Sequence, residues 1–463
     1  MLKKLNEWNE SNVKHLLSRA MFGFKREDVT QALTFSLDDF VDNILLGTTL
    51  KPIPPGLWVN QLPDWDNTES NILMYGHLGI WQYELMRKQS TSFTEKMVAF
   101  LSNHFVSEAR KVFIPQFQYK QNALFREYAM GNFKELTKKI SIDPAMVIYL
   151  DSESNTKNIP NENFGRELME LFTIGIGNYT EQDIRNAARA LTGWYIDDLT
   201  TSLDSDLHDS GSKTFMGQSG NFDYAKIVDI IFEQNETAKF ICRKIYKEFV
   251  YYIPDEAVVT ELANIFRNNN YELKPVFSAL FKSEYFYNDS IKASKIKSPY
   301  DLIIGMFKQF SITSINYRYI ANISEKLQQY IFNAPDVRGW EGQRKWISTS
   351  LIPLRNSFSD SLFTGKSIVE EEEDNLTGDI GFKVNIIEFA RTFSCSEEAE
   401  QFVTDVIDYL FLFPINQNTK DRMLQTLLDG SVKEDWSTHN NGAEARLIKF
   451  FKALTRLPEY QLK

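Results

Sequence analysis

The sequence is poor in the residues that build disulfide scaffolds and the commonest metal centres. Its 463 residues include only two cysteines, Cys242 and Cys395, and five histidines. One pair of cysteines so far apart cannot form a disulfide framework or a CxxC metal motif. We therefore expect two buried thiols.

Membrane and export signals are also missing. No apolar run approaches the roughly 18 residues needed to span a bilayer. The N-terminal stretch MLKKLNEWNESNVKHLLSRAMFGF lacks an apolar h-region and a small-residue cleavage site. We therefore expect no transmembrane segment and no signal peptide, which places the chain as written in the cytoplasm unless a leader has been removed.

Positive charge is in short supply. The 51 Lys and Arg residues are outnumbered by 62 Asp and Glu, so that the formal net charge is -11 and the pI is near 5.2. Because phosphate binding requires a basic face, this balance argues against a nucleic-acid partner. It leaves room for a local basic pocket.

Standard catalytic signatures are absent as well. The sequence contains no GxxxxGK, no GxGxxG after a predicted strand, no HExxH and no GxSxG. A ferritin-like di-iron site requires Glu-x-x-His, whereas Glu167 is followed three residues later by Glu170. These absences lower the expectation of an enzyme without removing it.

Helical periodicity dominates what is present. Apolar residues recur at 3.6-residue spacing along most of the chain, and strict alternation is scarce. We expect an all-α fold with one large multi-helix domain. Residues 11–20 predict a helix that stops at Gly23, a proline-rich loop covers residues 51–64, and helices resume near Ile72.

Two polar segments interrupt the predicted domain. Residues 197–223 predict a long excursion with a short hairpin at TFMGQSGNF. Residues 366–383 include four consecutive glutamates and predict a solvated acidic connection. On this interpretation residues 10–365 form the helical core, and residues 384–463 form a C-terminal helical segment of the same domain.

The most informative segment, residues 159–194, predicts two helices joined by a glycine-containing turn. Asn161 suits the N-cap of the first helix, and Gly175 and Gly177 end it. Thr180 and Asp183 form a capping box for the second helix. The first helix has a buried apolar stripe, formed by Phe164, Leu168, Leu171 and Phe172.

Charged residues occupy the other faces of this helix pair. Glu162, Arg166 and Glu170 follow one another at i+4 steps, and Glu167 lies beside them. Arg166 can therefore pair with a carboxylate on the turn before it and on the turn after it. Three interpretations stay open, namely a structural ion-pair network, a metal or catalytic carboxylate site, and plain surface charge.

The blocks NENFGRELMELFTIGIGNYTE and AARALTGW in this segment resemble the signature of the DUF1800 family, a large bacterial family named for its unknown function. Further blocks agree in order along the chain, namely HLLSRAMFGF, EKMVAFLSNHF, IDPAMVIYLD, HDSGSKTFMG, IKSPYDLI and APDVRGWEGQRKWI. The resemblance covers essentially the whole chain, but it implies no agreed reaction.

The resemblance carries further implications about location and partner. Many relatives are predicted to be exported, and a gene for a DUF1501-type protein, itself similar to sulfatases and alkaline phosphatases, often lies beside theirs. A protein of that type is therefore a candidate partner. The chain departs from the family pattern at FLSNHF, where Leu101 and Ser102 replace the usual Trp and His, and at APDVRGW, where PPNVxGW is usual.

Two histidines are candidates for chemistry. His104 lies on the apolar stripe of its predicted helix, which favours a core histidine over a metal ligand. His208 precedes Asp209 in the polar excursion, so it is either bonded within the loop or serves as a metal ligand or general base. In VRGWEGQRKW, stacking of Arg on Trp and a sugar- or anion-binding platform are both open.

Two hypotheses of function follow. In the first, the protein is a non-catalytic accessory or binding protein that docks a partner, or a surface polymer such as a polysaccharide, through aromatic side chains. In the second, it is a metal-dependent hydrolase or oxidoreductase with catalytic residues Glu162, Arg166, Glu167, His208 and Asp209. A divalent metal would be held by Glu167, Glu170, His104 and His208, which must then converge in the fold.

Overall fold

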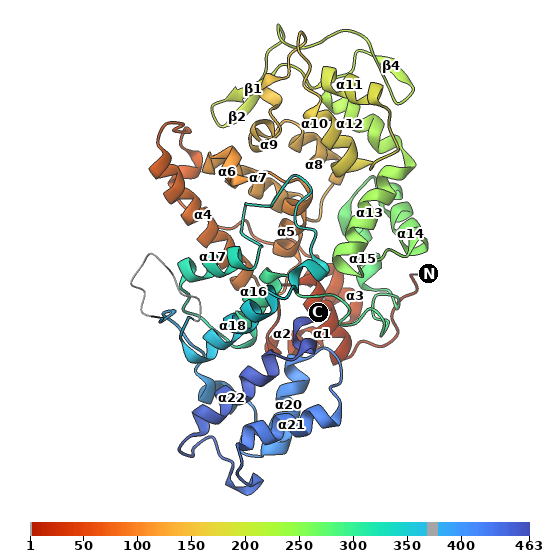
Figure 1. Cartoon of the computed structure of the whole chain (residues 1–463). Coiled ribbons are helices and arrows are strands. Elements are labelled where there is room, and N and C mark those ends of the chain that lie inside the picture. The colour runs from red at the N-terminus through yellow and green to blue at the C-terminus, as the bar shows by residue number, and fades with distance from the viewer. Residues whose placement is uncertain (1, 368–377) are drawn as a thin grey trace. The chain divides into compact units, whose positions relative to one another are not determined.

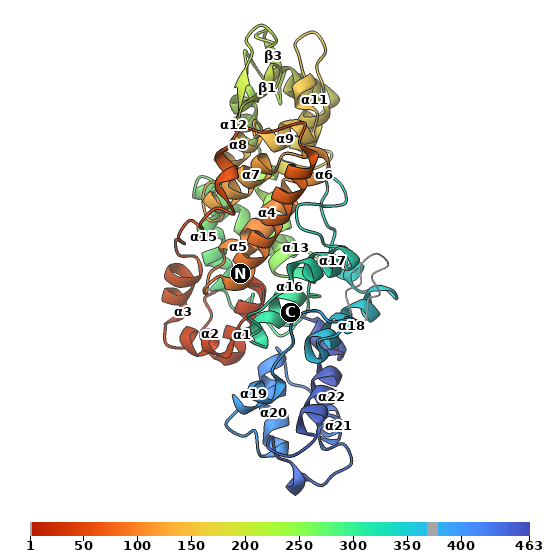
Figure 2. The ribbon, with the colours of Figure 1, turned by 90° about the vertical axis from the view of Figure 1, so that its left-hand side faces the viewer.

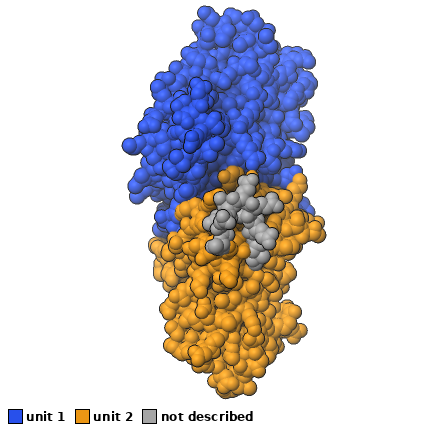
Figure 3. All heavy atoms as spheres, turned by 60° about the vertical axis from the view of Figure 1, so that its left-hand side comes forward, with its two compact units in different colours: residues 1–5, 37–285, 331–341 blue, residues 6–36, 286–330, 342–463 orange. Residues whose placement is uncertain are grey.

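Helices account for most of the regular structure in the computed structural model, which describes residues 2–367 and 378–463 (Figures 1 and 2). The predicted all-α class is thus confirmed. The chain packs as two units (Figure 3). Unit 1 comprises residues 1–5, 37–285 and 331–341, and unit 2 comprises residues 6–36, 286–330 and 342–463.

Unit 1 contains most of the helices and both sheets. Its α-helices are α3 (Leu37–Asp39), α4 (Thr68–Lys88), α5 (Thr94–His104), α6 (Ala109–Val112), α7 (Pro115–Glu127), α8 (Phe133–Ile140), α9 (Pro144–Tyr149), α10 (Asn163–Glu167), α11 (Glu181–Ala190), α12 (Tyr224–Glu233), α13 (Asn235–Phe249), α14 (Glu256–Asn268) and α15 (Leu273–Phe281). Two π-helices, Phe40–Leu45 and Leu168–Thr173, follow α3 and α10 directly.

Unit 2 combines two early helices with the C-terminal third of the chain. Its helices are α1 (Glu10–Ala20), α2 (Arg26–Ala32), α16 (Pro299–Gln309), α17 (Tyr317–Lys326), α18 (Leu351–Thr364), α19 (Ile386–Arg391), α20 (Ala399–Leu410), α21 (Gln417–Leu428) and α22 (Ala443–Thr455). Gly23, with a φ of +78°, lets the turn after α1 meet α16, because a Cβ there would lie 2.5 Å from Gly305 Cα.

Side-chain caps explain where several helices begin. Asn9 Oδ1 accepts a hydrogen bond from Asn12 N and starts α1, which confirms the helix predicted over residues 11–20. Asn67 Oδ1 accepts from Ser70 N, so α4 begins at Thr68, a turn earlier than apolar periodicity indicates. The prolines before it leave residues 51–64 without an α-helix, as predicted.

The polar excursion folds into two small hairpins. Strand β3 (Lys213–Phe215) pairs antiparallel with β4 (Gln218–Gly220), which confirms the hairpin predicted at TFMGQSGNF. Strands β1 (Trp194–Asp197) and β2 (Thr200–Leu203) form a second sheet that the sequence did not indicate. The excursion therefore has regular structure of its own.

The predicted domain boundaries at residues 10–365, 366–383 and 384–463 stay a prediction. Residues 368–377, which hold the run of glutamates, lie outside the described residues. The two units divide the chain at other points, because residues 331–341 belong to unit 1 while the segments on both sides belong to unit 2.

Aromatic rings fill much of both cores. In unit 1, Phe93 lies edge-on to Phe249, Phe277 and Phe281, with centroid distances of 4.7–5.1 Å. Comparable groups of phenylalanines are buried in unit 2. Helix packing thus accounts for a large part of the high aromatic content.

Two further features of the described residues concern the cysteines and the apolar character of the helices. Cys242 and Cys395 are both buried and unbridged, as predicted. Within the part of the chain that the structure describes, no helix combines the length and the apolar character needed to cross a membrane.

An ion pair inside unit 1 ties α5 to α7. Arg126 Nε donates to Glu95 Oε1 (2.7 Å) and Arg126 Nη2 donates to Glu95 Oε2 (2.9 Å). Gln82 Nε2 of α4 donates to the same carboxylate (3.0 Å). The two charged side chains are only 8% and 7% exposed, so each depends on the other for neutralisation.

We predict that Glu95→Gln lowers the free energy of unfolding by about 3–5 kcal/mol, because the buried Arg126 guanidinium loses its counter-charge. Glu135→Gln is the matched control, since Glu135 pairs with Lys138 at a side chain that is 47% exposed, and it should change stability by no more than about 0.5 kcal/mol. Urea unfolding followed by circular dichroism measures both. Equal losses in the two variants would contradict a special role for the buried pair.

Candidate functional site

The helix pair predicted at residues 159–194 is present, with a change of geometry in its first helix. Helix α10 starts at Asn163 and continues from Leu168 as the π-helix Leu168–Thr173. Gly165 packs against α11, where an added Cβ would lie 3.2 Å from Ala188 N. The capping box of Thr180 and Asp183 at the start of α11 is confirmed.

Arg166 belongs to a partly exposed ion-pair network. It contacts Glu162 (3.4 Å) and Glu181 (2.9 Å), and Glu162 also lies 3.7 Å from Arg185. The expected pair with Glu170 is replaced by Glu181, because the π-helix breaks the i+4 spacing after Arg166 and α11 brings Glu181 alongside. The Glu181 hydrogen bond raises the pKa of Arg166 above its usual value. At this exposure such pairs contribute little to stability.

Glu167 and Glu170 lie in a different environment. Glu170 accepts a hydrogen bond from Tyr179 Oη (2.9 Å). Burial, together with that bond to a carboxylate, raises the pKa of Tyr179 to about 12. Burial, and then repulsion from Glu170, outweigh the attraction to Arg166 and raise the pKa of Glu167, and a smaller repulsion from Asp336 adds to this effect. These carboxylates therefore crowd one another.

Asp336, which belongs to the APDVRGW block, is a third carboxylate, and it acts on Glu167. Its side chain accepts from Arg338 N (2.8 Å) and from Arg338 Nη2 (2.7 Å), and its carbonyl accepts from Gly339 N (2.9 Å). Arg338 is thus paired with Asp336 in its own turn. Two segments separated by about 170 residues place like charges together.

Asn103 fixes that turn to α5. Its Oδ1 accepts from Trp340 N (2.7 Å) and its Nδ2 donates to Trp340 O (3.2 Å). Gly339 has a φ of +78°, and a Cβ there would lie 2.3 Å from Asn103 Oδ1. No larger residue fits at Gly339 without displacing Asn103.

Tyr149, at the end of α9, is the last member of this group of carboxylates and tyrosines. Its side chain is 8% exposed. Burial, followed by the negative charges of Glu108, Asp336 and Glu167, raises its pKa to about 12. The site is therefore a patch of carboxylates and phenols drawn from four chain segments.

His104 has a structural environment. Its Nε2 faces Phe172 O (2.9 Å) and donates to it, which leaves Nδ1 to accept from Lys244 Nζ (3.1 Å). Lys244 Nζ also donates to Leu171 O (2.7 Å). Burial, with Lys244 nearby, holds the pKa of His104 well below its usual range, and burial lowers the pKa of Lys244 to about 7. The two side chains satisfy carbonyls that the π-helix leaves unpaired.

His208 and Asp209 are bonded within the excursion. His208 Nδ1 lies 2.9 Å from Thr192 O. Arg189 Nε donates to Asp209 Oδ2 (2.7 Å), and this guanidinium lowers the pKa of Asp209. The pair therefore anchors the excursion to the end of α11.

The structure does not assemble the predicted ligands Glu167, Glu170, His104 and His208 into a metal centre. Among residues 2–367 and 378–463, no three histidine, cysteine, aspartate or glutamate side chains are arranged to hold a metal ion. The physical reason is that protein groups already occupy both His104 nitrogens and that His208 is bonded within the excursion. The catalytic roles suggested for Glu162, Arg166, Glu167, His208 and Asp209 stay predictions.

The segments that meet at this patch are the ones that resemble family blocks. A family model described as "Protein of unknown function (DUF1800)" matches residues 15–462. The chain belongs to the DUF1800 family. No curated protein and no solved structure matches it. Family membership therefore assigns no activity to the patch.

Sequence reasoning missed Asn103, Tyr149, Tyr179 and Asp336. All four lie inside blocks that resemble the family: Asn103 in FLSNHF, Tyr149 in IDPAMVIYLD, Tyr179 in GNYTE and Asp336 in APDVRGW. A turn of the form Asp-x-x-Gly is a signal for Asp336, since a short polar side chain bonds to the backbone two residues later. Tyr149 and Tyr179 carry no such signal.

We predict that Glu167→Gln stabilises the protein at neutral and alkaline pH, because it removes a crowded charge. With the folded pKa above the unfolded one, the native state retains a proton that the unfolded state has released, so wild-type stability falls as the pH rises through that interval. The variant should lack this loss, which urea unfolding between pH 4 and pH 8 measures. A variant that is less stable than wild type at pH 8 would instead support a structural ion-pair role for Glu167.

Proposed function

We propose that this protein is a binding or accessory protein whose apolar surface docks a partner protein. The observation that carries the proposal is a concentration of exposed large apolar side chains in one short part of unit 1. In the described residues it is formed by Leu50 (95% exposed), Ile53 (86%), Leu57 (89%), Leu62 (63%), Trp65 (52%), Ile72 (61%), Leu73 (62%) and Ile80 (39%). We call these eight residues the apolar surface.

Aromatic contacts underneath hold the segment before α4 in place. Trp81 Nε1 donates to Ile53 O (2.7 Å), and the Trp81 and Trp58 rings pack against Tyr119 with centroid distances of 5.5 and 6.5 Å. Trp65 packs on Phe117 (5.9 Å). These contacts and the prolines already restrict the segment in the unbound protein. Binding of a partner therefore costs little additional conformational entropy.

Clustered exposed apolar residues mark interaction sites more often than scattered ones do. Helix α4, which Figures 1 and 2 show as a long helix, adds Ile72, Leu73 and Ile80 from its outer side. Gly76 lies between them with nothing within 4 Å of an added Cβ, so another helix can approach closely there. A mid-helix glycine costs about 1 kcal/mol relative to alanine, which this close approach would offset.

The chemistry of the apolar surface favours a protein over a polysaccharide. Sugars stack on aromatic rings, and Trp65 is the one ring among the eight side chains. Exposed Asp64, Asp66 and Glu69 lie beside the apolar residues in the sequence. These acids favour a partner with a basic rim and disfavour a second copy of the same surface.

The first partner to test is the DUF1501-type protein that the family resemblance suggests. We predict that Leu57→Glu/Leu73→Glu weakens its binding at least 100-fold in biolayer interferometry, at roughly 1.5–3 kcal/mol for each apolar anchor lost. The unfolding temperature should not change, since both side chains are exposed. Ile159→Glu/Ile176→Glu is the matched control, because both residues are 75% exposed elsewhere in unit 1.

A second readout does not depend on the choice of partner. The dye 1-anilinonaphthalene-8-sulfonate should fluoresce with the native wild type and with the control, and much less with the Leu57/Leu73 variant. Dye binding without binding of the DUF1501-type protein rejects that partner alone. Equal dye fluorescence in both double variants, or none with wild type, overturns the proposed apolar surface.

A further inference from the structure

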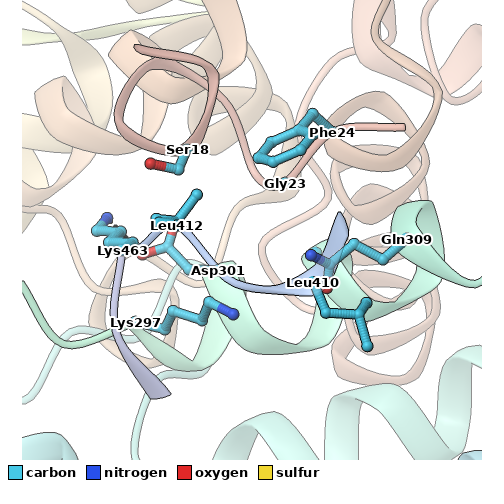
Figure 4. Close-up of a pocket in the computed structure, with 10 residues that line it drawn as sticks. Ser18, Gly23, Phe24, Lys297, Asp301, Gln309, Leu410, Leu412 and Lys463 are labelled. Atoms are coloured by element: carbon cyan, nitrogen blue, oxygen red, sulfur yellow. Dashed lines mark hydrogen bonds and ion pairs between the residues drawn. The ribbon is translucent and has the colours of Figure 1, made fainter. Parts of the chain in front are cut away.

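Unit 2 contains a small cavity with an unusual charge balance. Its volume is about 20 Å³, enough for one water-sized particle or slightly more. Apolar walls come from Phe24, Gly305, Leu410 and Leu412, and the polar side chains at its edge are Ser18, Lys297, Asp301, Gln309 and Lys463 (Figure 4).

Lys297 is a cation at the edge of this cavity that makes no ion pair among the described residues. Its Nζ lies 3.9 Å from the centroid of the Tyr460 ring. Among the carboxylates that the structure describes, none lies within ion-pair distance of this nitrogen. Burial, and then the positive charge of Arg355, outweigh the attraction of Asp301 and lower the pKa of Lys297 to about 7, as expected where an ammonium is only partly neutralised.

The neighbouring charges increase this imbalance. Asp301 is committed to Lys463, whose Nζ lies 2.5 Å from it, and both side chains are 4% exposed. Arg355, 1% exposed, donates to Lys297 O (3.0 Å) and to Gln461 Oε1 (2.8 Å), and its Nη1 is buried without a hydrogen-bond partner. Three cations, Lys297, Arg355 and Lys463, thus share the carboxylate side chain of Asp301.

Gln309 presents a second donor to the same space. Its Oε1 accepts from Tyr460 Oη (2.7 Å), so its Nε2 points the other way. Lys297 and Gln309 extend toward each other from opposite sides of the cavity (Figure 4). Tyr460 spans the gap, with its ring under Lys297 Nζ and its hydroxyl on Gln309. Two donors that face a small apolar-walled space require an acceptor, and the excess of cations selects one that carries negative charge.

We propose that this cavity binds one small monovalent anion, of the size of chloride or of a single carboxylate group, between Lys297 Nζ and Gln309 Nε2. The small volume favours such an anion over phosphate and sulfate. The anion supplies the counter-charge that Lys297 lacks and thereby stabilises the packing of the turn after α1 and of the segment Leu410–Leu412 around α16.

The test is thermal unfolding of the full chain at constant ionic strength, with sodium gluconate replaced stepwise by chloride or by formate. We expect a saturable rise of the unfolding temperature of roughly 2–4 °C with either small anion, and none with sulfate. Lys297→Met should abolish the rise. Lys292→Met is the control, because Lys292 is a largely buried lysine of the same unit that lies beside Asp289 (4.0 Å), and it should retain the rise.

Gln309→Glu is a second variant, which adds a negative charge to the cavity where Lys297→Met removes a positive one. The new carboxylate keeps the acceptor for Tyr460 and supplies Lys297 with a built-in counter-charge, so the unfolding temperature should become independent of the anion. Crystals soaked in bromide should show one anomalous peak between residues 297 and 309. A non-saturable rise, a rise that persists in Lys297→Met or in Gln309→Glu, or the absence of that peak overturns the proposal.

Discussion

The double hydrogen bond between the Asn103 carboxamide and the backbone of Trp340 is the constraint on which the arrangement of the DUF1800 blocks in unit 1 depends. An amide that binds both the N–H and the C=O of one residue fixes the position of that residue, here Trp340 in the turn after Asp336. Gly339 is required for the same reason, because its backbone lies against Asn103 where a side chain would stand. Asp336, in the same turn, acts electrostatically on Tyr149 and Glu167.

Much of the local structure could be predicted because its causes are local. Capping residues, apolar periodicity and turn residues lie within a few positions of the features they create, so α1, the capping box at Thr180 and the β3–β4 hairpin followed from short stretches. The π-helix after α10 could not be predicted, since it arises where Lys244 and His104, far away in the chain, bind its carbonyls.

The candidate site was only partly predictable for a related physical reason. Spacing shows which residues share a helix face, but a carboxylate's partner depends on which other element packs there. Arg166 therefore pairs with Glu181 of the next helix, while at Glu167 burial and the like charge of Glu170 outweigh the attraction to Arg166. The same limit applies to the cavity of unit 2, whose cations Lys297 and Lys463 come from separate segments and meet only in the folded unit.

The two units alternate along the sequence, and this order affects how the chain folds during its synthesis. Unit 2 begins with residues 6–36, in which His15 contacts Phe286 and Arg19 contacts Ile291. The ribosome makes these partners only after the roughly 250 residues of unit 1 that lie between them in the sequence. At typical elongation rates this delay lasts roughly 12–50 s. During synthesis, the side of α1 that carries His15 and Arg19 therefore stays without these contacts over that interval, and a chaperone that holds exposed apolar segments would cover it until the later part of unit 2 has emerged.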